Sequence, residues 1–164
     1  MVIIAVAISI GGLQIAFRYN KRVSLLEKCI LMVNAINAEI EYLLKPSADI
    51  IDSLAGRQDL ADLKFLRSCS LKMNEGWDFY SAWRESLSDK ENVAYLSDSD
   101  VEILSSFSEL FGVTGCDGQS LNCNLFSSKL QFALNEAVKD RDKYSKLFSS
   151  LGLLTGLCFI IVFI

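Results

Sequence analysis

The most constraining feature of this sequence is a pair of apolar segments at its two extreme ends. Residues 1–17 and 147–164 contain no Asp, Glu, Lys or Arg. A helix of either length approaches the roughly 30 Å thickness of the hydrocarbon core of a bilayer. The chain is therefore predicted to cross a membrane twice, once at each end.

Basic residues flank each apolar segment on its inner side alone. They are Arg18, Lys21 and Arg22 after the first segment, and Lys139, Arg141, Lys143 and Lys146 before the second. Lys and Arg beside a membrane span are retained on the cytoplasmic side. We therefore expect residues 18–146 to form one cytoplasmic domain, with both termini across the cell membrane.

A cleaved signal peptide is the alternative interpretation of the first segment. Signal peptides carry positive charge before the apolar run and a small-residue cleavage site after it. Here the apolar run starts at Met1, and a basic segment follows it. The sequence therefore favours a retained membrane span.

The composition narrows the chemistry available to the domain. The net charge is −4, which argues against nucleic acid as a partner because such proteins present a basic face. The chain has no histidine, which removes His-based metal sites and the catalytic groups that need an imidazole base. The five cysteines match no zinc spacing, and we expect them to be reduced. We expect no enzyme activity, no cofactor and no bound metal.

Apolar residues recur at helical spacing between the two segments, and no stretch shows the alternation of a strand. Helices are expected over residues 19–44, 47–55, 59–75 and 77–87, from Ser97 or Asp98 to residue 111, and over 121–146. Pro46, Gly56 and Gly76 are expected to end the first three helices. The predicted fold is all-α: a six-helix antiparallel bundle with a transmembrane helix at each end. The first and sixth helices are expected to run into the spans without a break.

Glycines mark candidate packing sites in the spans. Gly152 and Gly156 form a Gly-x-x-x-Gly motif in the second span, and Gly12 lies in a stripe of small residues in the first. Small residues let helices approach closely in lipid, where hydrophobicity supplies no drive between them. The two spans are expected to pack on each other or on the span of a partner.

A glycine-rich turn is expected at residues 112–119. Gly112, Gly118 and Gln119 are the candidate contact residues of this turn. A phosphate-binding loop would need a lysine in the turn and a strand before it, and the sequence has neither. A turn between two helices is therefore the favoured interpretation.

Two further groups of side chains have both a structural and a functional interpretation. The aromatic cluster of Trp77, Phe79, Tyr80 and Trp83 is expected to pack in the core, with a partner groove as the alternative. Carboxylate pairs such as Asp98 with Asp100, and Glu39 with Glu41, are expected to belong to a solvated surface. Neither group predicts a catalytic site.

The order and spacing of several short motifs resemble those of the stage III sporulation protein AB family of endospore-forming bacteria. The motifs are RYNKR at 18–22, NAEIEY at 37–42, AWRE at 82–85, DVEIL at 100–104, LFG at 110–112, GQ at 118–119 and KYSKL at 143–147. One position departs from the family pattern, because Gly115 stands where the family carries an aspartate. Asp117 is a candidate replacement.

The resemblance implies a function as well as a fold. The family is similar to the F platform protein of type II secretion and type IV pilus systems. It implies a structural membrane platform in the channel between mother cell and forespore, located on the mother-cell side in the outer forespore membrane. Other stage III sporulation proteins, a cytoplasmic ATPase among them, would be partners, and homo-oligomers are possible. The alternatives are a membrane-anchored helical sensor or adaptor that binds a cytoplasmic partner, and a membrane-tethered enzyme.

Overall fold

The computed structural model describes the backbone of residues 2–43, 47–111 and 116–163. Side chains are described at residues 14–40, 47–109, 111, 118–144 and 147. The helices are α1 (Val2–Leu43), α2 (Ser47–Ala55), the 3-10 helix η1 (Gln58–Leu60), α3 (Lys64–Asn74), α4 (Phe79–Ser88), α5 (Asp98–Leu110) and α6 (Cys116–Phe163). The described residues contain no strand, which confirms the predicted all-α fold.

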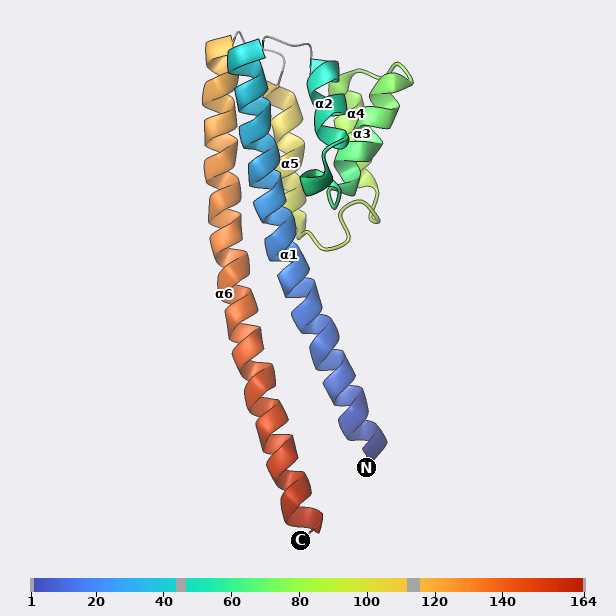
Figure 1. The fold of residues 1–164 in the computed structure, drawn as a ribbon, viewed down its shortest axis with the longest axis vertical. Helices are drawn as coiled ribbons and strands as arrows, with labels where there is room; N and C mark the ends of the chain where they lie inside the picture. The colour runs from blue at the N-terminus through green and yellow to red at the C-terminus, as the bar shows by residue number, and fades with distance from the viewer. Residues whose placement is uncertain (1, 44–46, 112–115, 164) are drawn as a thin grey trace.

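Two long antiparallel helices, α1 and α6, organise the molecule (Figure 1). Helix α5 packs on α6 and α4, helix α3 packs on both α2 and α4, and α2 contacts α1. Both long helices extend beyond the short ones at the same end, so the N- and C-termini lie at that end (Figure 1). This arrangement confirms that the first and sixth helices run without a break toward the two termini.

Among the residues that the structure describes, no helix combines the length and apolar character needed to cross a membrane. The expected spans, residues 1–17 and 147–164, lie almost entirely outside the side chains that are described. Membrane insertion of these two segments stays a prediction.

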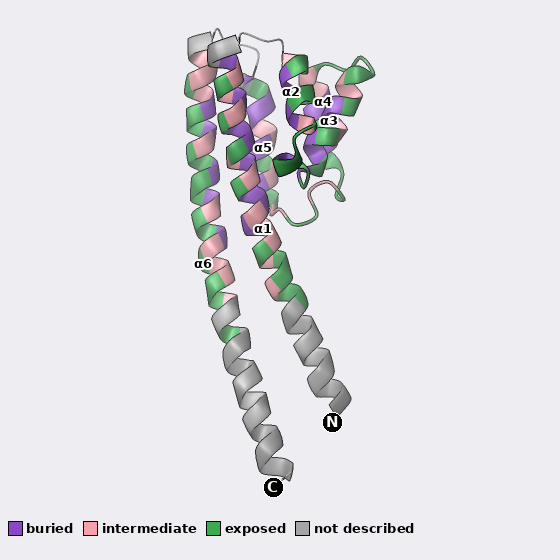
Figure 2. Ribbon diagram, viewed as in Figure 1, coloured by how far each residue is buried: buried purple, intermediate pink, exposed green. Residues whose placement is uncertain are grey.

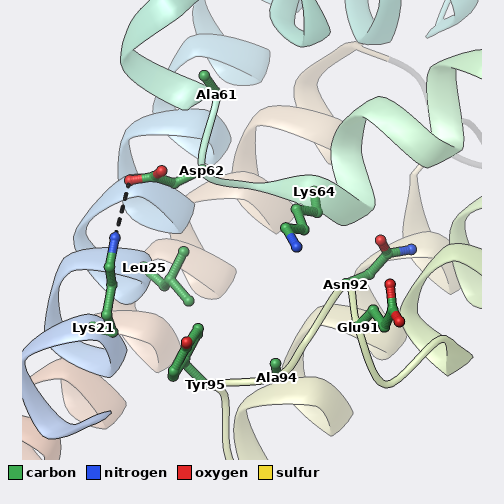
Figure 3. A pocket seen from close by; sticks show the side chains of 9 residues that line it. All are labelled: Lys21, Leu25, Ala61, Asp62, Lys64, Glu91, Asn92, Ala94 and Tyr95. Atoms are coloured by element: carbon green, nitrogen blue, oxygen red, sulfur yellow. Dashed lines mark ion pairs between the residues drawn. The ribbon is translucent and has the colours of Figure 1, made fainter. Parts of the chain in front are cut away.

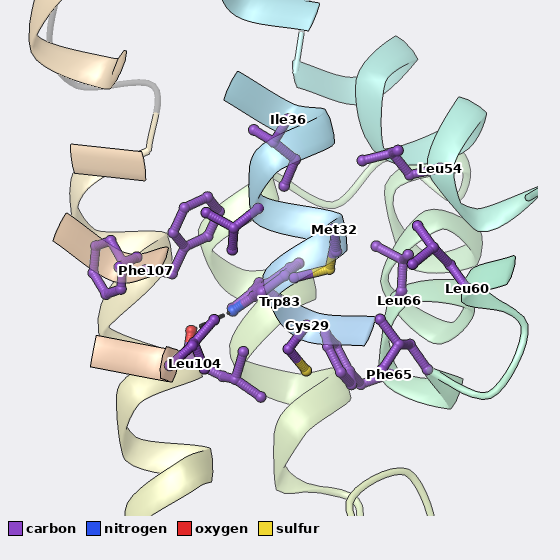
Figure 4. Packing of buried hydrophobic residues seen from close by; sticks show 14 of the residues in the cluster. Cys29, Met32, Ile36, Leu54, Leu60, Phe65, Leu66, Trp83, Leu104 and Phe107 are labelled. Atoms are coloured by element: carbon purple, nitrogen blue, oxygen red, sulfur yellow. Dashed lines mark hydrogen bonds between the residues drawn. The ribbon is translucent and has the colours of Figure 1, made fainter. Parts of the chain in front are cut away.

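The core is built on one face of α1, which points toward the short helices (Figure 2). Buried α1 residues at helical spacing are Leu26, Cys29, Met32, Val33, Ile36 and Ile40. Opposite them lie buried side chains of the other helices, among them Leu54, Phe65, Leu66, Leu104 and Phe107 (Figure 4). Burial of each large apolar side chain contributes about 1.5–3 kcal/mol. The apolar residues that recur at helical spacing in the first helix form its buried face, as their periodicity predicted.

Trp83 of α4 lies at the centre of this core. Its side chain is fully buried, and its Nε1 donates a hydrogen bond of 2.7 Å to the carbonyl oxygen of Leu104 (Figure 4). The rings of Phe65, Phe79 and Phe107 surround it at centroid distances of 5.3, 5.3 and 5.6 Å. Trp83 is therefore a packing residue, as its first interpretation predicted, and the indole offers no surface to a partner.

Two expected boundaries in the middle of the chain differ from the structure, each for a local reason. The expected helix 59–75 divides into η1 and α3, because the buried Leu63 has a non-helical ψ of 77°. Helix α4 begins at Phe79 rather than Trp77, because the Asp78 side chain accepts a hydrogen bond from the Ser81 amide at 3.0 Å. Gly76, with φ of +98°, follows α3 as expected.

The sixth helix begins at Cys116, five residues earlier than predicted. Gly118 and Gln119 therefore lie in its first turn, and the prediction that they belong to a loop is wrong. A glycine near a helix N-terminus is tolerated, because the first amide groups of a helix have no intrahelical partner. The rest of the expected turn, with Gly112, lies outside the described residues.

Candidate functional site

Polar and aromatic side chains gather at the end of the domain where α1 and α6 leave it. We call this region the exit end and define it as residues 15–22 of α1, 95–100 at the start of α5, and 140–144 of α6. These segments are far apart in the sequence, and the antiparallel pairing of α1 with α6 brings them together (Figure 1). The exit end is the part of the structure where charged groups are most deeply buried.

Arg22 and Asp100 form a buried bidentate ion pair at the exit end. Arg22 Nε donates to Asp100 Oδ2 at 2.8 Å, and Nη2 donates to Oδ1 at 3.0 Å. The Asp100 side chain is 0% exposed and the Arg22 side chain 15% exposed. Asp140 of α6 lies 3.6 Å from Arg22 Nη1, so one guanidinium joins α1, α5 and α6.

A capping box at the start of α5 holds the carboxylate in place. The Ser97 hydroxyl accepts from the Asp100 amide at 3.2 Å, and Asp100 Oδ2 accepts from the Ser97 amide at 2.9 Å. Burial alone would raise the pKa of Asp100, but the hydrogen bonds from Arg22 and Ser97 hold that pKa below its ordinary value. Both carboxylate oxygens are occupied, so Asp100 is placed to fasten helices rather than to exchange protons.

The interpretation of Asp100 as a solvated acid is wrong, whereas Asp98 is exposed as expected. Two sequence signals point to the pair. Arg22 falls on the apolar stripe of α1, four residues before Leu26, where an unpaired charge would be costly. Ser97 and Asp100 have the Ser-x-x-acid spacing of a capping box. Arg22 and Asp100 are 78 residues apart, so no local sequence pattern could show that they pair with each other.

Two tyrosines close the exit end beside the ion pair. The rings of Tyr19 on α1 and Tyr144 on α6 stack with centroids 4.5 Å apart and planes inclined by 17°. Desolvation of the Tyr19 hydroxyl, together with its hydrogen bond to Tyr144, raises the pKa of Tyr19 to about 12. Tyr19 is therefore a neutral phenol at physiological pH.

An open groove of about 470 Å³ runs along the exit end. Its lining residues are Ile15, Arg18, Tyr19, Arg22, Tyr95, Leu96, Ser97 and Tyr144. Tyr95 also lines a smaller recess of about 290 Å³ between α1, the turn before α3 and the α4–α5 loop (Figure 3). In that recess Asp62 pairs with Lys28 and lies 4.0 Å from Lys21.

The other predicted site residues lie elsewhere. Gly12 belongs to α1, and Gly152 and Gly156 belong to α6, but their surroundings fall outside the described side chains. Gly118 and Gln119 are half-buried at the opposite end of α6 from these glycines. Among the predicted site residues with described side chains, Trp83 lies in the core and Gly118 and Gln119 lie at the start of α6, so these do not form one site. The exit end is a site that sequence reasoning missed.

Comparisons with known proteins agree on one family. The family model described as stage III sporulation protein AB matches residues 1–164. The stage III sporulation protein AB of Bacillus subtilis strain 168 is 25% identical over 162 residues, which cover 98% of this chain and 95% of that protein.

A solved structure of a stage III sporulation protein AB supports the same fold. It covers 75% of this chain and 98% of its own, with a TM-score of 0.63 and 22% identity. The family model extends over the entire sequence, as does the alignment with the Bacillus protein to within a few residues. This chain belongs to the stage III sporulation protein AB family.

Proposed function

We propose that this protein is a structural membrane component of the channel between mother cell and forespore during endospore formation. Family membership supports a role in sporulation. The channel role extends the family's similarity to secretion platform proteins to this chain. In this proposal the two ends of the chain cross the membrane, and residues 18–146 form a cytoplasmic domain without enzymatic activity.

The observation that carries the proposal is the geometry of the two long helices. Helices α1 and α6 run from the core of the domain to both ends of the chain without a break, and both leave from the same end (Figure 1). Two apolar segments that leave one end of a domain can enter one bilayer together. Basic residues lie on the domain side of each apolar segment, and they favour the cytoplasmic side of the membrane for the domain.

The buried ion pair supports a structural rather than a catalytic task. Arg22 fastens α1 to α5 and lies close to Asp140 of α6, at the point where the two long helices leave the domain. Such a clamp resists a change in the angle between the helices. A platform needs this property, because any force between its spans and its cytoplasmic partners passes through these helices.

The adaptor alternative is favoured by a second exposed surface. Leu71, Trp77 and Tyr80, at the corner between α3 and α4, are 57%, 47% and 43% exposed. Lys72 lies 5.1 Å from the centroid of the Trp77 ring. Trp and Tyr are enriched among residues that dominate protein interfaces. This corner is suited to an adaptor that binds a cytoplasmic partner.

A topology and partner experiment tests the proposal. Alkaline phosphatase fused after Ile164 is expected to be active, and a reporter inserted near Asn92 is expected to behave as cytoplasmic. Affinity purification of the full chain from sporulating cells should bring down membrane components of the channel and a cytoplasmic ATPase of the stage III group. An active phosphatase in the Asn92 loop would refute the topology. Recovery of a single cytoplasmic partner without channel components would favour the adaptor.

A further inference from the structure

The groove at the exit end is lined by Arg18, a cation with no acidic partner among the described side chains. Arg18 is exposed, and no described side chain forms an ion pair or hydrogen bond with it. The neighbouring cations differ from Arg18 because each has an acidic partner. Lys21 lies 4.0 Å from Asp62, and Arg22 pairs with Asp100. Tyr95 and Tyr144, which carry hydroxyl groups, line the groove with Arg18, whereas the Ser97 hydroxyl already accepts hydrogen bonds from Arg22 and the Asp100 amide. Guanidinium and hydroxyl groups together are suited to a phosphate.

Ile15 and Tyr95 line the groove with Arg18, and Phe17 contacts Tyr95 beside it. Ile15, Phe17 and Tyr95 are 41%, 52% and 38% exposed. Phe17 and Tyr95 meet edge to face with their centroids 6.0 Å apart, so the α4–α5 loop reaches back to α1 just where the helix leaves the domain. Basic, aromatic and aliphatic side chains at one level form the pattern found where a protein meets the headgroup region of a membrane.

We propose that this groove binds the headgroup phosphate of an anionic phospholipid. Arg18 contacts the phosphodiester, the tyrosine hydroxyls donate to its oxygens, and Ile15 and Phe17 contact the start of the acyl chains. The proposal rests on the membrane insertion proposed above, because α1 and α6 lead from this groove to the apolar ends of the chain. A lipid also accounts for the exposure of Ile15 and Phe17, which a free phosphate would leave in water.

The test uses the full chain in an uncharged detergent, titrated with short-chain phosphatidylglycerol or phosphatidylcholine and followed by native mass spectrometry. Wild-type protein should bind phosphatidylglycerol more tightly than phosphatidylcholine. Arg18→Gln should weaken phosphatidylglycerol binding about fivefold, equivalent to the roughly 1 kcal/mol of one cation near an anionic surface. Tyr95→Ala should weaken it in the same direction. Inorganic phosphate should not displace the lipid.

Two matched variants separate the groove from general effects. Lys129→Gln removes one exposed charge from α6 away from the exit end, and Tyr80→Ala removes an exposed tyrosine from α4. Both should bind lipid as the wild-type protein does. Circular dichroism of all four variants should remain helical, because the replaced side chains are outside the core.

Two outcomes would overturn the proposal. One is equal phosphatidylglycerol binding by the wild-type protein and Arg18→Gln, and the other is an equal loss in Lys129→Gln. If the first outcome is accompanied by failed spore formation in Arg18→Gln and Tyr95→Ala, the groove is assigned to a protein contact. A separate measurement of whether the chain inserts into bilayers distinguishes failure of this inference from failure of the proposed function. A chain that inserts without lipid preference refutes the inference alone, whereas a chain that does not insert refutes both.

Discussion

Replacing Asp100 with alanine is expected to be among the most damaging single changes outside the apolar core. Asp100 is 0% exposed and accepts three hydrogen bonds, two from Arg22 and one from the Ser97 amide. Removing one partner of a buried ion pair costs about 3–5 kcal/mol, because the other charge stays buried without compensation. In the variant, Arg22 would still have Asp140 at 3.6 Å, and its side chain is 15% exposed. We therefore expect a loss of stability at the lower end of this range, about 3 kcal/mol.

Guanidinium unfolding of residues 18–146, followed by helical circular dichroism, measures this loss. A domain of this kind is stable by about 5–15 kcal/mol, so a loss of about 3 kcal/mol moves the midpoint clearly. Asp98→Ala is the matched control, because Asp98 is an exposed acid in the same first turn of α5. It should cost no more than about 1 kcal/mol, the usual contribution of a charge near a helix terminus.

A compensating pair distinguishes an unpaired charge from lost volume. Arg22→Met with Asp100→Leu removes both charges and keeps side chains of similar size. The stability of this double variant should return to within about 1 kcal/mol of the wild-type protein, since apolar replacements of buried ion pairs are often neutral. Equal costs for Asp100→Ala and Asp98→Ala would refute the reasoning. A double variant no more stable than Asp100→Ala would show that the charges themselves matter less than the local packing.

The same pair predicts how stability depends on pH. The folded pKa of Asp100 lies below its unfolded value of about 4. Its contribution to stability is therefore complete above about pH 4 and is lost as the pH falls through the lower, folded pKa. The difference in stability between the wild-type protein and Asp100→Asn should accordingly shrink in acid.

Two further predictions concern the core and the spans. Trp83→Ala should destabilise the domain by about 3–5 kcal/mol, because it removes a fully buried ring, whereas Trp77→Ala, at a 47% exposed position, should change the melting midpoint little. An unchanged midpoint in Trp83→Ala would contradict the packing role. Gly152→Leu combined with Gly156→Leu should leave insertion intact but disrupt assembly, because close helix approach in lipid is lost at a cost of about 1 kcal/mol or more. Normal spore formation and unchanged co-purification of partners in this double variant would count against the packing role of these glycines.

Helix type and position were readable from the sequence because they depend on neighbours within a few turns. Ser47–Ala55 begins and ends where Pro46 and Gly56 predicted. The apolar stripe of α1 was readable for the same reason, since burial of one helix face imposes a period of 3.6 residues. Trp83 was correctly placed in the core from its aromatic neighbours, although Trp77 and Tyr80 of the same cluster are exposed.

Local sequence patterns predicted the helix boundaries less well where competing interactions decide where a helix begins or ends. The break at Leu63 and the start of α6 at Cys116 depend on which conformation packs best, and several conformations agree with the local sequence. Asp98 and Asp100 illustrate the same limit. They lie two residues apart and look alike in the sequence, but one is exposed and the other is fully buried.

What the sequence by itself determined was the all-α class, the periodic core of α1 and the continuity of the outer helices with the two ends of the chain. These follow from composition and from spacing along one helix. What only the tertiary structure decided was the exit end, where Arg22 meets Asp100 and Tyr19 stacks on Tyr144. These partners lie far apart in the sequence, Arg22 and Asp100 by 78 residues, and only the antiparallel packing of α1 with α6, with α5 alongside, brings their side chains within contact distance.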